Sequence, residues 1–233
     1  MSEKITRAII SIPTYNGHVH MGLIGAIHCA SFRMKDHGIR IIRQSLLTKC
    51  FNMLWQAALK DRERGITHFA MLHADIVPED GWLDKMLEIC ETNQTDVLST
   101  IIPLKNFSGL TSTAFEVGEK WKCRRLTMTE VIEGPETFHS EDLLLNTGLM
   151  VCDIRKPWAN EIVFRFEDSI VNGEAVNVPE DWGFSRQVRE LGGKLFATRA
   201  IKAQHFGEVD FDNYQAWGTM KTDTAYLQPA IKT

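Results

Sequence analysis

Short apolar segments alternate with amphipathic segments along the first hundred residues of the chain. Apolar runs of four to eight residues are typical of buried strands, and apolar positions three or four apart are typical of helices. Strands are predicted at residues 7–13, 39–42, 67–72 and 96–103, and helices at 19–34, 45–59 and 78–91. This alternation predicts an α/β fold, with a single Rossmann-like, mostly parallel sheet flanked by helices.

The alternation stops at residues 104–143, which we interpret as an insertion, and then returns. Further strands are predicted at 144–151, 194–198 and 200–204. A helix is predicted between Pro179 and Gly192, because Pro and acids mark helix starts and Gly marks helix ends. We expect residues 1–207 to form one domain and residues 208–233, which are polar and aromatic, to form a tail or lid.

The strand at 67–72 runs directly into His73-Ala74-Asp75. Ligands of open α/β sheets bind outside the carboxyl ends of the strands, so His73 and Asp75 lie where a site is expected. Imidazole and carboxylate groups are both common metal ligands. The sequence therefore predicts a metal site or another polar site at this edge of the sheet.

Three further segments lie at strand ends or helix starts. Tyr15, after the first strand, could stack on a base, and Gly148 would let a ligand approach the backbone closely. Lys49 begins a predicted helix, where a cation could neutralise a diphosphate. Each segment also has a plain structural interpretation, as a turn, a bulge or an exposed lysine.

Taken in order, these motifs resemble family 2-like GT-A-fold glycosyltransferases of the phage and environmental branch. The resemblance covers about residues 7–207 and is weakest at 104–143. It rests on Ser-Ile-Pro-Thr-Tyr-Asn at 11–16, His-Ala-Asp with its Trp-Leu helix, Asn-Thr-Gly at 146–148, Glu180-Asp181 and the late His205. The chain departs from the family where His73 replaces the first Asp of Asp-x-Asp and Phe51 replaces an Arg.

The resemblance implies a metal-dependent glycosyltransferase that moves a sugar from a UDP- or GDP-sugar to an acceptor hydroxyl. Asp181 would be the catalytic base, Glu180 would orient the acceptor, and Asp75, His205 and His73 would hold Mn²⁺ or Mg²⁺. The implied nucleotide-sugar-binding residues are Pro13, Thr14, Tyr15, Asn16, Lys49, Asn52, His73, Ala74, Asn146, Thr147 and Gly148. Residues 104–143 would then lie on the acceptor side.

Composition narrows the choice of acceptor and compartment. The formal net charge of −4 argues against a general nucleic-acid binder. The basic run at 120–125, with Trp121 inside it, could grip an anionic acceptor or form a solvated hairpin face. In one version of the implied activity, the enzyme adds a sugar to a flipped hydroxymethylated base of phage DNA. Five cysteines without a CxxC pair and an N-terminus without an apolar leader predict a cytoplasmic location, the host cytoplasm if the protein is viral.

Two other classes of protein remain open from the sequence. A nucleotidyltransferase of similar architecture would carry a Gly-rich, basic loop after the first strand, which residues 14–17 lack. A non-catalytic nucleotide-sugar-binding module is suggested by His73 in place of an acid. The aromatic residues beyond 208 could also pack on a partner subunit in a homo-oligomer.

Overall fold

The computed structural model describes residues 7–33, 37–207 and 210–224, and its centre is a seven-stranded sheet of order β2-β1-β3-β10-β5-β13-β8. The strands are β1 Ala8–Thr14, β2 Gly38–Arg43, β3 His68–Leu72, β5 Val97–Thr100, β8 Thr137–Phe138, β10 Leu149–Asp153 and β13 Leu195–Thr198. Strands β10 and β8 run opposite to the other five. The prediction of a mostly parallel sheet is confirmed.

Successive side chains on the central strands point to opposite faces, and each face has its own apolar core. In β3, Phe69 and Met71 belong to one core, whereas Ala70 and Leu72 belong to the other. Strands that are covered on both faces read as continuous apolar runs. This explains why the central strands could be recognised in the sequence.

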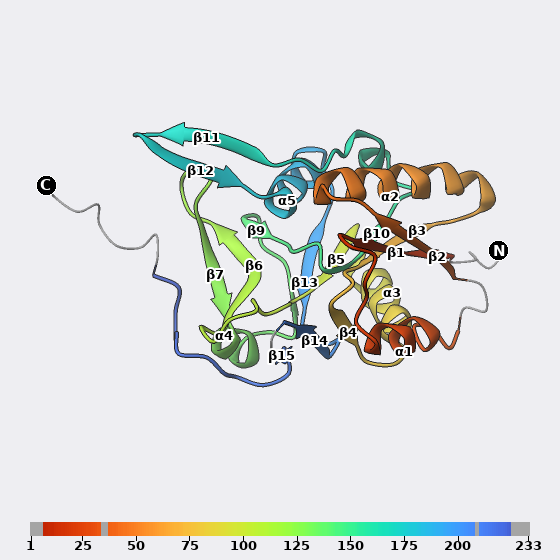
Figure 1. Cartoon of the computed structure of the whole chain (residues 1–233), viewed down its shortest axis with the longest axis horizontal. Helices are drawn as coiled ribbons and strands as arrows, with labels where there is room; N and C mark the ends of the chain where they lie inside the picture. The colour runs from red at the N-terminus through yellow and green to blue at the C-terminus, as the bar shows by residue number, and fades with distance from the viewer. Residues whose placement is uncertain (1–6, 34–36, 208–209, 225–233) are drawn as a thin grey trace, which may run out of the picture.

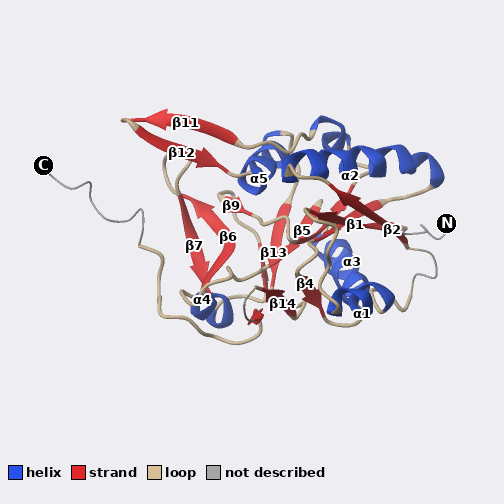
Figure 2. Cartoon of the chain, in the orientation of Figure 1, coloured by secondary structure: helices blue, strands red, loops and turns tan. Residues whose placement is uncertain are grey.

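Helices cover both faces of the sheet, so the molecule has three layers (Figure 1, Figure 2). The helices are α1 Gly22–His28, α2 Leu47–Asp61, α3 Trp82–Asn93, α4 Met128–Glu133 and α5 Glu180–Glu190, with 3-10 turns η1 Arg62–Arg64 and η2 Pro157–Glu161. On one face α2 and α5 bury Trp55 and Phe184. On the other face α1 and α3 bury Leu23 and Trp82.

Three smaller sheets surround this core. Their strands are β4 Ile76–Pro78, β14 Ala203–Phe206 and β15 Asp210–Asp212; β6 Leu110–Glu116, β7 Cys123–Thr127 and β9 Leu143–Leu144; and the hairpin of β11 Glu167–Val171 and β12 Glu174–Val178. The hairpin projects from the body at the upper left of Figure 1. Residues 104–143 thus contain β6, β7, α4 and β8, and β8 joins the central sheet beside β13.

The described part of the tail packs back on the body. Asn213 is fully buried, and its side chain bonds the backbone of Ile101, Ile201 and Ala203. Residues 208–209 and 225–233 of the predicted tail or lid lie outside the described residues. None of the helices in the described ranges is long and apolar enough to cross a bilayer.

Three predictions differ from the structure, and one hairpin was not predicted. The strand predicted at 200–204 is β14, which begins only at Ala203. The helix predicted at 19–34 is the shorter α1, and residues 34–36 lie outside the described ranges. The single strand predicted at 144–151 is split into β9 and β10, because Asn146 bonds Gly148 and forms a turn between them. The hairpin β11–β12 was not predicted, because its exposed strands lack an apolar run.

Candidate active site

Strand pairing brings Asp75 and His205 together. Asp75 lies between β3 and β4, and His205 lies in β14. Strands β4 and β14 pair antiparallel, with His205 opposite Ile76, and the amide of Phe206 donates to the carbonyl of Asp75 over 2.8 Å. As a result, Nε2 of His205 lies 3.7 Å from Oδ2 of Asp75.

Lys105, in the loop between β5 and β6, binds the same carboxylate. Its Nζ donates a hydrogen bond to Oδ2 of Asp75. Burial alone would raise the pKa of Asp75, but the nearby His205 and the hydrogen bond from Lys105 outweigh that effect and hold the pKa well below its usual range. Asp75 is therefore an anion at neutral pH. No sequence motif had pointed to Lys105.

The two other nitrogens at this cluster have different environments. Nδ1 of His205 lies 2.8 Å from the carbonyl of Pro103 and must donate to it, since a carbonyl only accepts. Nε2 therefore faces Asp75. His73 is partly buried, and burial lowers its pKa to about 4 despite the nearby Asp75. Its Nε2 is buried and has no hydrogen-bond partner among the described residues.

A cavity of about 520 Å³ opens beside this cluster. Its walls come from the end of β1, the following loop, the start of α2 and the segment after β3. The lining residues are Pro13, Thr14, Tyr15, Asn16, His18, Val19, His20, Leu47, His73, Ala74 and Asp75. The structure thus joins the opening motif and the His-Ala-Asp segment, which the sequence had placed separately, in one cavity.

His20 is a lining residue that the sequence interpretation left out. Its ring stacks on Phe206 with centroids 3.7 Å apart, and its amide donates to the carbonyl of Ala74 over 2.7 Å. These contacts tie the loop after β1 to the His73–Asp75 segment. His18 and His20 form an HxH pair in the sequence, but with no acid or cysteine near it this pattern is a weak signal for a site.

Asn146 and Gly148 shape the floor next to His73. Asn146 is buried, and its side chain donates to the carbonyl of Thr100 and accepts from the amide of Gly148. The carbonyl of Gly148 accepts from the amide of His73 over 2.8 Å. A Cβ at Gly148 would lie 2.6 Å from Cδ1 of Ile76, so this position has no room for a side chain. Thr147 is buried in the same turn.

Asp181 and Glu180 begin α5. Burial and the charge of Glu180 raise the pKa of Asp181 to about 7, partly opposed by Arg125. Burial also raises the pKa of Glu180. Two carboxyls side by side in a partly buried position favour retention of a proton. Asp181 thus has a pKa suited to accepting or giving a proton near neutral pH.

A short chain of hydrogen bonds connects α5 to the cavity. Ser185 donates to the carbonyl of Asp181 over 2.9 Å and accepts from the amide of Leu145 over 2.9 Å. Leu145 directly precedes the Asn146–Gly148 turn, which bonds His73. Asp181 itself is not a lining residue of the 520 Å³ cavity. Its place opposite a bound sugar stays a prediction.

Two predicted donor contacts have other surroundings. The side chain of Asn52 bonds the backbone of Phe164. It donates to the carbonyl of Phe164 over 2.7 Å and accepts from the backbone amide of Phe164 over 2.9 Å. It does not line the cavity. Lys49 is exposed in the first turn of α2, two residues after the lining residue Leu47.

The predicted cation site is only partly formed. Asp75 and His205 are close, as a shared cation would require, and His73 offers an unpaired nitrogen nearby. However, the part of the chain that the structure describes holds no group of three His, Cys, Asp or Glu side chains placed to bind one metal ion. Lys105 already occupies Oδ2 of Asp75. As placed, these residues do not fit a divalent cation, and Mn²⁺ or Mg²⁺ as the cofactor stays a prediction.

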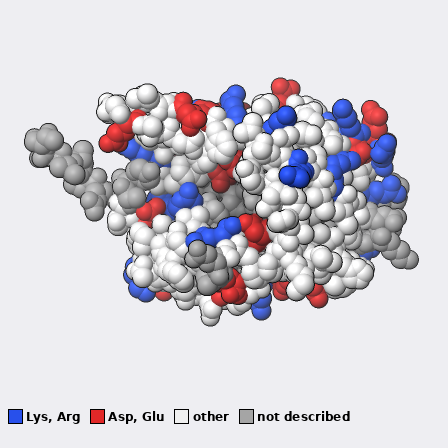
Figure 3. All heavy atoms as spheres, in the orientation of Figure 1, with Lys and Arg blue, Asp and Glu red and all other residues white. Residues whose placement is uncertain are grey.

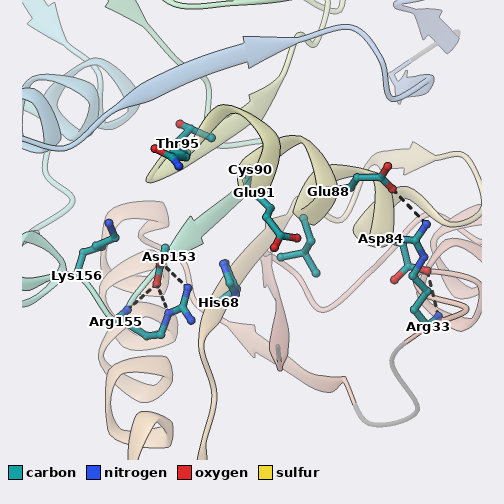
Figure 4. A pocket seen from close by; sticks show the side chains of 12 residues that line it. Arg33, His68, Asp84, Glu88, Cys90, Glu91, Thr95, Asp153, Arg155 and Lys156 are labelled. Carbon is teal, nitrogen blue, oxygen red and sulfur yellow. Dashed lines mark hydrogen bonds and ion pairs between the residues drawn. The ribbon is translucent and has the colours of Figure 1, made fainter. Parts of the chain in front are cut away.

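A second cavity, of about 640 Å³, lies at the other end of β3 (Figure 4). Its charged groups are largely paired with one another: Arg155 bonds Asp153 through two contacts of 2.8 Å, and Arg33 pairs with Glu88 at 3.2 Å. His68 faces this cavity, and burial lowers its pKa to about 4. It lies at the amino end of β3, away from the edge where parallel sheets bind ligands.

Comparison with known proteins supports the fold. No protein-family model matches the sequence, and no curated protein matches it. The chain is similar to the crystal structure of A197 from STIV, with a TM-score of 0.60 and 16% identity over 92% of this chain and 95% of that one. It is also similar to GalNAc-T7, crystallised with UDP, GalNAc and Mn²⁺, with a TM-score of 0.54 and 13% identity over 91% of this chain and 46% of that one.

At these identities the similarity concerns the fold. The chain has the GT-A fold, the fold of nucleotide-diphospho-sugar transferases, as its sheet order and flanking helices indicate. In this architecture the cavity beside Asp75 lies at the carboxyl ends of β1 and β3.

Proposed function

We propose that this protein transfers a sugar from a nucleotide-diphosphate sugar to an acceptor hydroxyl. The observation that carries the proposal is the cavity in which the β1 loop meets Asp75, and Asp75 in turn meets His205 and Lys105. The cavity has Tyr15 on its wall and this charged cluster beside it, at the ligand-binding edge of a GT-A fold. The neighbour GalNAc-T7, which was crystallised with UDP, is consistent with a UDP- or GDP-sugar as donor.

The residues suggest how a donor would bind. Tyr15 is 74% exposed at the cavity mouth and is free to stack on a base. We place the diphosphate at the Asp75 cluster, where it would follow the base and ribose. Gly148 holds the lining residue His73 through its carbonyl, which accepts from the amide of His73 over 2.8 Å. Thr14 and Asn16 are further polar residues that line the cavity.

Transfer breaks the bond between the anomeric carbon and the diphosphate oxygen, and the electron pair leaves with the diphosphate. The acceptor oxygen bonds the same carbon and loses its proton. We assign that proton to Asp181, whose pKa of about 7 suits a base at physiological pH. Glu180 orients the acceptor. If the sugar keeps its stereochemistry, the two acids position the acceptor instead.

The acceptor side is formed by β6, β7 and the start of α5. The four basic residues of the 120–125 run all have partners here: Lys120 pairs with Glu167, Lys122 with Glu119 and Arg124 with Glu130, and Arg125 lies over the ring of Trp182. Basic and acidic side chains are interspersed on the face shown in Figure 3. This arrangement favours a small hydroxyl acceptor over a DNA strand, and hydroxymethylated DNA is one arm of the acceptor test.

The test is a screen of UDP- and GDP-sugars, in Mn²⁺, in Mg²⁺ and in EDTA, for release of nucleoside diphosphate. The best donor is then offered to glycan, protein and hydroxymethylated DNA acceptors. We expect slow release from one donor alone and faster release with one acceptor. If a donor binds but no nucleoside diphosphate is released, the protein is a non-catalytic binding module. If pyrophosphate is released from a nucleoside triphosphate and a sugar phosphate, it is a nucleotidyltransferase.

A further inference from the structure

We propose that Lys105 supplies the positive charge that meets the diphosphate leaving group, in the position that a divalent cation would otherwise take. This inference rests on the proposed function and names the residue that serves the diphosphate at the same site.

The first support is the occupancy of Asp75. Lys105 Nζ bonds Oδ2 of Asp75, and Nε2 of His205 lies 3.7 Å from the same oxygen. A metal ion bound to that oxygen would have to displace the lysine and would meet its charge. The described residues provide no third acidic, cysteine or histidine ligand to complete a metal site. An ammonium group carries the charge without a full ligand set.

The second support is the built position of the lysine. A Cβ at Gly207 would lie 3.0 Å from Cδ of Lys105 and 3.4 Å from its Cβ, so the lysine stem lies against the bare backbone of Gly207. The loop that carries Lys105 is held by Pro103, whose carbonyl accepts from His205, and by Leu104, whose amide donates to Leu110 over 2.8 Å. The lysine is therefore directed to Asp75 by its surroundings.

The third support is the capacity of the group. A lysine ammonium has three donors, and its end is a compact point charge. One donor engages Asp75, and two remain for phosphate oxygens. The side chain is 38% exposed and bonds Asp75, which lines the cavity, although Lys105 is not itself a lining residue. When the anomeric carbon–oxygen bond breaks, the ammonium stabilises the negative charge that develops on the departing diphosphate.

Binding of inorganic pyrophosphate, measured by calorimetry in EDTA, tests the inference without requiring sugar transfer. We expect wild-type protein to bind, Lys105→Met to lose about tenfold or more in affinity, and Lys105→Arg to retain most of it. Gly207→Ala, which keeps the charge but displaces the stem, should also weaken binding. Lys202→Met, at an exposed lysine directly before β14, is the matched control and should bind normally. Thermal unfolding confirms that each variant is folded.

Nucleotide-sugar turnover with and without Mn²⁺ gives the second readout. We expect wild-type kcat/KM in EDTA to stay within about threefold of its value in Mn²⁺, and Lys105→Met to lose about 100-fold or more in EDTA. Pyrophosphate binding that depends on Lys105, without turnover of any donor, would uphold the lysine and reject the proposed function. The inference would be overturned if binding or turnover required Mn²⁺ and if Lys105→Met left it unchanged or improved it.

Discussion

Nε2 of His205 lies 3.7 Å from Oδ2 of Asp75, although the two residues are far apart in the chain. The contact depends on the pairing of β4 with β14, in which His205 lies opposite Ile76. A strand register that is fixed by backbone bonds positions both side chains before any ligand arrives. Lys105 adds a positive charge to the same carboxylate. A charged cluster is thus part of the folded chain.

Asp75→Asn should strongly impair use of the donor, because it removes the anion that orients Lys105 and His205. We expect a loss of about 100-fold or more in kcat/KM for the nucleotide sugar, measured by diphosphate release. Asp80→Asn makes the same chemical change at an exposed residue and should have no effect. Equal activity of the two variants would remove Asp75 from the site.

Activity should rise with pH through about 7, because Asp181 must lose its proton to act as base. The plot of log kcat/KM against pH should have a slope of one below that value and a plateau above it. In Asp181→Asn the activity should fall, and the region of slope one, the acidic limb of the profile, should disappear. An unchanged acidic limb in Asp181→Asn would assign the titration to another group.

Asp181 should also affect stability, with a sign set by its raised pKa. The folded state holds the proton more tightly than the unfolded state, so this carboxyl favours the fold at low pH and loses that effect as pH rises from about 4 to about 7. At pH 8, Asp181→Asn should raise the free energy of unfolding by about 1–2 kcal/mol. This is less than the full pKa shift would give, because solvent screens a partly exposed carboxyl. Urea unfolding at pH 5 and pH 8 checks this, and a larger gain at pH 5 would contradict it.

Gly148→Ala should disturb both the fold and the site. Its Cβ would lie 2.6 Å from Ile76 Cδ1, and overpacking of this kind costs about 1–3 kcal/mol. The shift should reach His73 and Asp75 and lower kcat/KM. Gly25→Ala, in α1, adds the same atom where no heavy atom lies within 4 Å. The control should be as stable as wild type or slightly more stable, as measured by thermal unfolding.

Asn52→Ala should separate a structural role from a binding role. The side chain makes two hydrogen bonds to the backbone of Phe164, so we expect a loss of about 1–3 kcal/mol in the free energy of unfolding. The KM for the donor should not change, because Asn52 does not line the cavity. A raised KM with unchanged stability would instead support the contact that the sequence predicted.

The central strands could be predicted from the sequence because they are covered on both faces and therefore apolar throughout. Strand ends then located His73 and Asp75 correctly at the carboxyl edge of the sheet. The antiparallel insertion of β10 between β3 and β5 could not be predicted, since an apolar run carries no information on its neighbours or direction. The same limit hid the β11–β12 hairpin, whose exposed strands have a mixed pattern.

Long-range packing decided the parts of the site that the sequence missed. Lys105 is an ordinary lysine in the sequence and matters because its loop is held near His205 through Pro103. His20 matters because Phe206, from the other end of the chain, stacks on it. Asn52 matched a family motif, but its amide bonds the backbone of Phe164. Only the folded arrangement distinguishes these cases.

A crystal structure of the wild-type protein with the nucleoside diphosphate of its best donor, grown in EDTA, examines the proposed site directly. We expect the base beside Tyr15 and the diphosphate within hydrogen-bond distance of Lys105, in the cavity of about 520 Å³. A diphosphate bound instead at the cavity around His68 and Arg155, or at Asp75 only when Mn²⁺ is supplied and Lys105 is turned away, would contradict this account.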